Sequence, residues 1–152
     1  MSDGTPTPDT ETAALREALA AEHTAIWGYG VVGAALGPAG RAPAAAAEAA
    51  HRDVRDRVTA LLAERKAAPV REQPGYSLPF PILSAVDAAA LGVVLEDGVA
   101  AAWVRVLGQA AQRAIRELAV GLLSAAEVRA VSWRFAARKK PVTSALPGLS
   151  GK

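Results

Sequence analysis

Apolar residues recur along most of this chain at alternating spacings of three and four, the period of an α-helix that packs on one side. Residues 1–8 have no such period and predict a disordered arm. From residue 9 or 10 the pattern predicts a first helix that ends near Gly37, because glycine is favoured just past a helix end and Pro38 follows. Its inward positions are Leu15, Leu19, Glu22, Ile26, Tyr29 and Gly33.

A second helix is predicted from about Pro43, because proline suits a first helical turn, and it stops before Pro69. About five residues then separate the first two helices, which predicts antiparallel neighbours. Residues 68–83 contain four prolines and a glycine and predict a long connection. The inward positions of the second helix are Ala44, Glu48, His51, Val54, Val58 and Leu61 or Leu62.

A third helix is predicted over residues 84–107, opened by Ser84 with Asp87 as its capping partner. Gly108 and Gln109 predict the break before a fourth helix. The order of hairpin, long connection and hairpin predicts an all-α, ferritin-like four-helix bundle over residues 9–138, with a simple up-and-down bundle as the alternative. Residues 139–152 are basic and then rich in Pro and Gly, and they predict a flexible tail. The inward positions of the fourth helix are Ile115, Leu118, Leu122, Ala126, Arg129 and Trp133.

Composition narrows the function classes. The 152 residues fit one domain, and a net charge of +2, with arginines beside acids, argues against a nucleic-acid partner. The absence of cysteine excludes disulfides and thiolate metal sites. Together with the acidic, polar start of the chain, it predicts a cytoplasmic protein. The longest uncharged stretch, residues 24–40, is short for a membrane span and contains Pro38, so no membrane association is expected.

Gly28, Gly30 and Gly33 form a literal GxGxxG string. A dinucleotide site requires a strand before this string and a helix that opens at it. Here the preceding residues are helix formers, so we interpret the glycines as positions where a neighbouring helix or large side chain approaches closely.

Glu48 and His51 form an ExxH pair, whose side chains lie about 60° apart on one helix face. Glu22 and Glu96 lie on the inward stripes of two other helices. A di-iron centre in such a bundle also needs an ExxH pair on the remaining helix, where this chain has Ala130. We therefore expect an inward polar cluster of Glu22, Glu48, His51 and Glu96, the remnant of a metal site, with no cofactor. The alternative is a site for iron or another divalent metal.

Three segments resemble one known family: AEHTAIWGYGVVGA in the first helix, YSLPFP in the connection and LEDGVAAAW in the third helix. The chain is similar, from residue 13 to about 135, to small alanine-rich actinobacterial proteins described as ferritin-like domains of unknown function. The LPGL string at residues 146–149 resembles the family's ending. The resemblance implies the ferritin-like fold and implies no activity.

Two functions are compatible with these sequence features. The first is a non-catalytic association module, expected to form a homodimer, because aromatic residues of the first helix and the connection are typical of interfaces. The second is a metal-dependent oxidase or storage protein that uses the polar cluster. In the connection, Tyr76 and Phe80 are expected to pack on the bundle.

Overall fold

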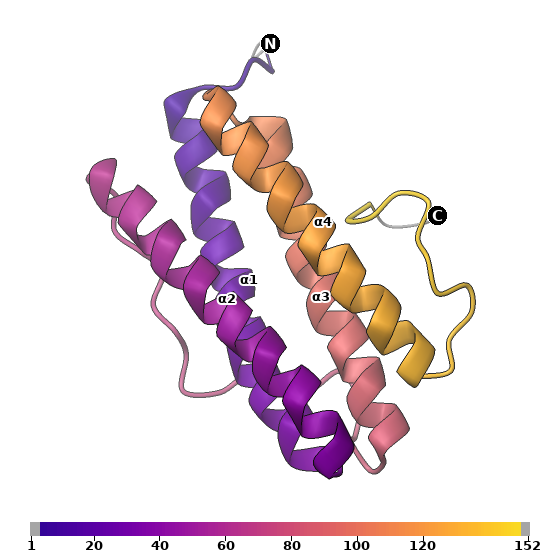
Figure 1. The fold of residues 1–152 in the computed structure, drawn as a ribbon. Helices are drawn as coiled ribbons and strands as arrows, with labels where there is room; N and C mark the ends of the chain where they lie inside the picture. Colours follow the sequence, from indigo (N-terminus) through magenta and orange to yellow (C-terminus); the bar gives the residue numbers. More distant parts are fainter. Residues whose placement is uncertain (1–3, 150–152) are drawn as a thin grey trace.

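The computed structural model describes residues 4–149, which form four helices and contain no strand. Figure 1 shows α1 and α2 as one antiparallel pair and α3 and α4 as another. The connection between the pairs runs along the molecule, so that α3 starts at the end where α2 starts. This confirms the all-α bundle with one long connection, the connectivity of ferritin-like bundles. The helix bounds are Pro8–Ala35 for α1, Pro38–Glu64 for α2, Ala85–Gln109 for α3 and Arg113–Ala136 for α4.

Hydrogen-bonding side chains start two of the helices. Thr7 caps α1, since its hydroxyl accepts from the backbone N–H of Thr10 at 3.2 Å and its own N–H donates to the Thr10 hydroxyl at 2.9 Å. Ser84 caps α3 by accepting from the backbone N–H of Asp87 at 3.1 Å. Each cap satisfies a donor that the helix itself leaves free, so the sequence defines these two starts locally.

The predicted five-residue link between the first two helices is wrong. Only Leu36 and Gly37 join α1 to α2, because Pro38, rather than Pro43, takes the first-turn position of α2. Pro43 lies inside α2. The break before α4 is also displaced, from Gly108 and Gln109 to residues 110–112.

Helix α1 packs against both α2 and α3, and α3 packs against α4. Glycines set the closest approaches. A Cβ atom at Gly28 would lie 2.6 Å from the Leu95 methyl carbons, and one at Gly92 would lie 2.8 Å from the Trp133 ring. The GxGxxG string therefore lies within α1, where its first glycine admits a side chain of α3, and it follows no strand.

The long connection is attached to α1 at two points. The rings of Tyr76 and Trp27 lie 5.7 Å apart, and His23 Nε2 lies 2.9 Å from the carbonyl oxygen of Val70. Phe80 is partly buried against the hydrophobic core. The expected packing of Tyr76 and Phe80 is thus present.

The C-terminal segment lies against α3 and α4. The buried guanidinium of Arg134 donates to Glu127, to Asp97 and to the carbonyl oxygen of Val142, at 2.8, 2.7 and 3.0 Å. Glu127 also accepts from the backbone N–H of Ser144 at 3.1 Å. These contacts follow the chain as far as Ser144. The predicted flexibility of residues 139–152 stays a prediction, and so does that of the arm at residues 1–8; residues 1–3 and 150–152 lie outside the described part.

None of the helices described for residues 4–149 combines the length and apolarity that a membrane crossing requires.

Candidate functional site

Three of the four predicted polar residues meet at the centre of the bundle. Glu22 on α1, His51 on α2 and Glu96 on α3 are 1%, 0% and 0% exposed. His51 Nδ1 lies 2.6 Å from Glu22 Oε2, and His51 Nε2 lies 3.1 Å from Glu96 Oε1. A ring nitrogen that faces a carboxylate must donate, and only the protonated imidazole donates from both nitrogens. His51 is therefore an imidazolium that bridges two carboxylates.

Glu48, the fourth predicted member, lies elsewhere. Its side chain is 26% exposed and pairs at 2.5 Å with Arg52, one helical turn further along α2. The prediction that Glu48 joins the inward cluster is wrong. The angular offset of about 60° from His51 leaves Glu48 at the edge of the buried face, where a long charged side chain turns to water.

Helix α4 completes the cluster with a cation. Arg129 Nε donates to Glu96 Oε1 at 2.8 Å. The same oxygen also accepts from the Tyr29 hydroxyl and from His51, whereas the buried Oε2 of Glu96 has no partner among the described residues. We call Glu22, His51, Glu96 and Arg129 the buried charge cluster. One residue from each helix takes part in it.

Two tryptophans and a tyrosine surround the buried charge cluster. Trp103 Nε1 donates to Glu22 Oε1 at 2.9 Å, and Trp133 Nε1 donates to the Tyr29 hydroxyl at 2.7 Å. The Tyr29 ring also stacks on His51, with 5.5 Å between ring centroids. The polar end of each ring thus has a hydrogen-bond partner, as buried Trp and Tyr require.

Ionisation follows from these contacts. Burial opposes the charge of His51, but the hydrogen bonds and negative charges of Glu22 and Glu96 outweigh it and raise the pKa of His51 to about 9. Burial likewise opposes the charge of Glu96, yet His51 and Arg129 outweigh it and lower the pKa of Glu96. Burial, and then the charge of Glu96, raise the pKa of Tyr29 above its usual range, so the phenol remains a donor.

The charges of the cluster balance. Glu22 and Glu96 contribute two negative charges, and the His51 imidazolium and the Arg129 guanidinium contribute two positive charges. Buried ions are tolerated when they are paired and hydrogen-bonded. The cluster is therefore self-consistent with its own four side chains.

The side chains do not fit a two-metal centre. Such a centre needs inward carboxylates from two helices and a Glu-x-x-His pair from each of the other two. Here α4 supplies the cation Arg129 and then Ala130, and both ring nitrogens of His51 already face carboxylates. Across residues 4–149, no three or more His, Cys, Asp or Glu side chains are grouped so that they could hold a metal ion.

Sequence reasoning did not assign four members of this network: Tyr29, Trp103, Arg129 and Trp133. A signal for three of them was present, because Tyr29, Arg129 and Trp133 lie on the predicted inward stripes. Helical periodicity says which residues face inward but not which polar atoms meet, since that depends on the relative rotation of four helices.

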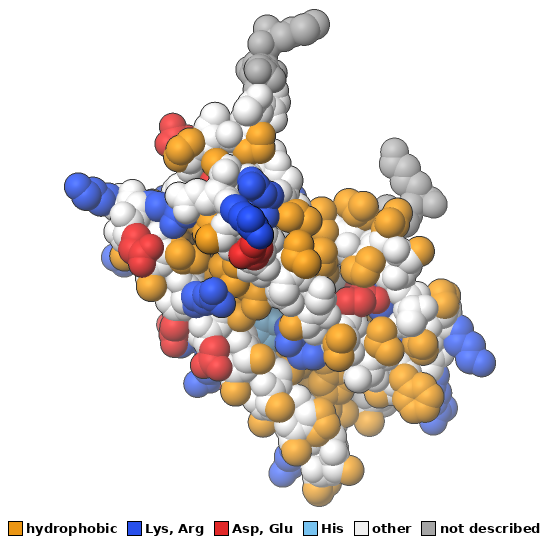
Figure 2. Space-filling view, turned by 45° about the horizontal axis from the view of Figure 1, so that its top comes forward, with side chains coloured by type: hydrophobic (Ala, Val, Ile, Leu, Met, Phe, Trp, Pro, Cys, Tyr) orange, Lys and Arg blue, Asp and Glu red, His pale blue; other side chains and the backbone are white. Residues whose placement is uncertain are grey.

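A second feature lies on the surface of α4. Gly121, Ser124, Val128, Ser132 and Phe135 follow one another along the side that faces away from the core, and we call them the outer face of α4. Val128 is 69% exposed and Phe135 is 78% exposed. Figure 2 shows charged side chains close together on the α2 side, at the left, while uncharged side chains predominate over α4. Large exposed apolar side chains grouped on one face are typical of contact surfaces.

The family model described as "Domain of unknown function (DUF4439)" matches residues 14–151. Among solved structures, the chain is similar to a conserved hypothetical protein, rv2844, from Mycobacterium tuberculosis. The two are 36% identical, with a TM-score of 0.82, and the match covers 85% of this chain and 98% of that one. No curated protein matches. The resemblance found in the sequence is confirmed, and the chain belongs to the DUF4439 family of domains of unknown function.

Proposed function

We propose that this protein is a non-catalytic helical module that acts by association, and that its first partner is a second copy of itself. The observation that carries the proposal is the outer face of α4, where Val128 and Phe135 are exposed on a face without charged side chains. Aromatic and aliphatic residues at the centre of a surface patch with few charges are typical of protein interfaces.

The interior supports a non-catalytic role. Catalytic groups must reach a substrate, yet Glu22, His51 and Glu96 are at most 1% exposed. Their hydrogen bonds are made to one another and to neighbouring side chains, so a substrate could reach them only if the helices separated. Such a network fixes how four helices fit together, which is a structural task.

The surface of α2 provides the contrast. Its exposed side carries Arg52, Arg55 and Asp56, which are paired with neighbouring acids or bases on the same helix. Removing such charges from water is costly, so α2 is unsuited to a close contact with another protein. The two surfaces differ in the property that decides whether water can be displaced.

Oligomeric state tests the proposal. Sedimentation equilibrium of the full chain should show a reversible monomer–dimer equilibrium with a Kd of about 1–100 μM, as expected for a small interface. Val128→Lys on α4 should abolish the dimer, while the matched variant Ala49→Lys, at an exposed position of α2, should leave it intact. A chain that stays monomeric up to about 1 mM, or that loses its dimer equally in both variants, overturns the proposal.

One observation favours the metal-binding alternative. The buried Oε2 of Glu96 has no hydrogen-bond partner among the described residues, and a carboxylate oxygen is a ligand for iron and other divalent metals. We expect substoichiometric iron and no ferroxidase activity after aerobic iron loading. Two tightly bound irons per chain, lost in His51→Ala, would make this alternative the leading function.

The cytoplasmic location inferred from the sequence is part of the same proposal. Fractionation of cells that produce the native chain tests it directly: recovery outside the cytoplasmic fraction contradicts it.

A further inference from the structure

The outer face of α4 has a projecting residue and an open position at matching distances from its centre. Phe135 lies seven residues after Val128, and Gly121 lies seven residues before it. Because seven residues complete almost two helical turns, the three positions lie within about 40° of one another around the helix. They form one straight line along the exposed side of α4.

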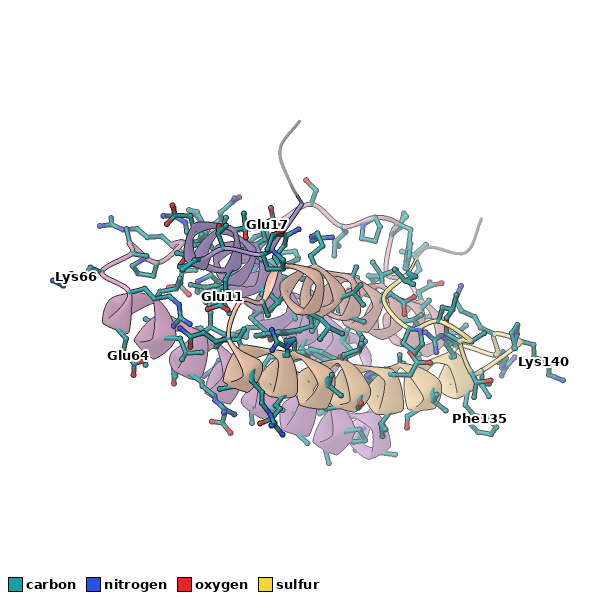
Figure 3. All side chains as sticks on the ribbon, turned by 90° about the horizontal axis from the view of Figure 1, so that it is seen from above. Glu11, Glu17, Glu64, Lys66, Phe135 and Lys140 are labelled. Atoms are coloured by element: carbon teal, nitrogen blue, oxygen red, sulfur yellow. The ribbon has the colours of Figure 1, made fainter. Side chains whose placement is uncertain are left out.

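Phe135 is the projecting residue. It is 78% exposed, and Figure 3 shows its side chain pointing away from the bundle. Burying an aromatic ring is among the largest favourable contributions that one side chain makes at an interface. A ring in this position thus has much free energy to gain from a partner surface.

Gly121 is the open position. A Cβ atom built there meets nothing within 4 Å. It lies in a hollow of about 420 Å³ between α4 and α2, whose lining includes Leu118, Leu122 and Arg57. This hollow has the leucine side chains and the room that one phenyl ring needs.

We propose that two copies of this chain pair through antiparallel α4 helices around a two-fold axis at Val128. Each Phe135 then enters the hollow beside the partner's Gly121, and the two Val128 side chains meet on the axis. This inference rests on the proposed function, because it assumes that the outer face of α4 is the association surface. It adds the orientation, the register and the residues that make the contact.

Charge complementarity selects the antiparallel arrangement. Glu117 lies eleven residues before Val128, and Lys139 lies eleven residues after it. An antiparallel pair therefore brings each Glu117 near the partner's Lys139, and it also opposes the two helix dipoles. A parallel pair would place Glu117 beside the partner's Glu117 and Lys139 beside the partner's Lys139, which repel.

Cysteine cross-linking tests the register, because the chain has no cysteine of its own. Val128→Cys should form a disulfide-linked dimer under mild oxidation, since facing positions of helices packed at about 8–10 Å come within disulfide reach. Gly121→Cys alone and Phe135→Cys alone should not, because each would lie about 21 Å along the axis from its own copy. An equal mixture of these two single variants should cross-link as the mixed dimer only.

The control is Ala49→Cys on the exposed side of α2, which should not cross-link at the same protein concentration. In addition, Phe135→Ala should weaken dimer formation at least tenfold in sedimentation equilibrium while leaving the circular dichroism spectrum unchanged.

The outcomes separate the two claims. A disulfide formed by Gly121→Cys alone means a parallel pair and overturns this inference. So does a native dimer by sedimentation whose Val128→Cys variant fails to cross-link, and in that case association itself still stands. A chain that is monomeric at every concentration overturns the inference and the proposed function together.

Discussion

The centre of the bundle and the outer face of α4 differ in where charge is placed. Inside, Glu22, His51, Glu96 and Arg129 bring four ionised groups together with little access to water. Outside, on the same stretch of α4 that supplies Arg129, Val128 and Phe135 are exposed on an uncharged face. The usual distribution of polar and apolar side chains is reversed over these turns.

The reversal indicates what each region does. Burying ions costs free energy, and a buried pair seldom stabilises a protein more than apolar side chains of the same volume would. The buried charge cluster therefore serves to fix one arrangement of the helices. Leaving Val128 and Phe135 in water also costs free energy, and that cost is recovered only by a partner.

The largest effect should come from breaking the cluster at its centre. His51→Ala leaves two buried carboxylates facing each other without the cation between them, so the free energy of unfolding should fall by about 3–5 kcal/mol. The matched control Arg52→Ala, one residue further on α2 but exposed, should cost less than about 1 kcal/mol. Urea titration of both variants measures the difference; equal losses would show that His51 has no special role.

A pH titration sharpens the same point. The pKa of His51 is raised to about 9 from 6.5, so its stabilisation is complete below pH 6.5 and is lost as the pH rises through 9. The free energy of unfolding should fall across this window with a slope of at most about 1.4 kcal/mol per pH unit. His51→Gln, which cannot be charged, should flatten the slope. A slope that persists in this variant would assign it to another group.

The two phenylalanines of the chain test the comparison from the apolar side. Phe80 is partly buried against the core, so Phe80→Ala should cost about 2 kcal/mol of folding stability, less than the 3–5 kcal/mol of a fully buried ring. It should leave dimerisation unchanged. Phe135→Ala should do the reverse, with less than about 0.5 kcal/mol of folding cost. Paired urea and sedimentation measurements decide; a larger folding cost for Phe135 contradicts the exterior role.

The smallest effect is expected at the C-terminal segment. Gly148 has φ +78°, and a Cβ atom there would lie 2.6 Å from the carbonyl oxygen of Ala100. Gly148→Ala should release the end of the segment and increase amide exchange near Ser144, while the thermal midpoint changes by less than about 2 °C. A larger change in the midpoint would show that the segment is part of the stabilising core.

Periodicity in the sequence was enough to predict four helices and their connectivity, because each helix has its own apolar stripe and residues 68–83 interrupt the pattern strongly. Local chemistry misled at Pro38 and Pro43, since either proline can occupy a first turn and only packing decides between them. For the site, inward stripes identified Glu22, His51 and Glu96. They failed for Glu48, because a position at the edge of a face can turn to water or to the core.

The contribution of Arg129 to the cluster illustrates the remaining limit. Its position on the stripe of α4 was visible, but an arginine there is equally compatible with a surface role. What assigns it is the distance to Glu96 across two helices, which depends on how α3 and α4 are rotated and crossed. No local signal in the chain contains that information.

The position of His51 has a consequence for how the molecule opens. Helix α2 packs mainly on α1, yet His51 connects it to Glu22 on α1 and to Glu96 on α3. If α2 separates alone, two charges on the remaining helices lose their counter-ion, so partial opening costs nearly as much as complete unfolding. Amides in the middle of α2 should then exchange hydrogen only through global unfolding. The buried charge cluster makes a peripheral helix part of one cooperative unit.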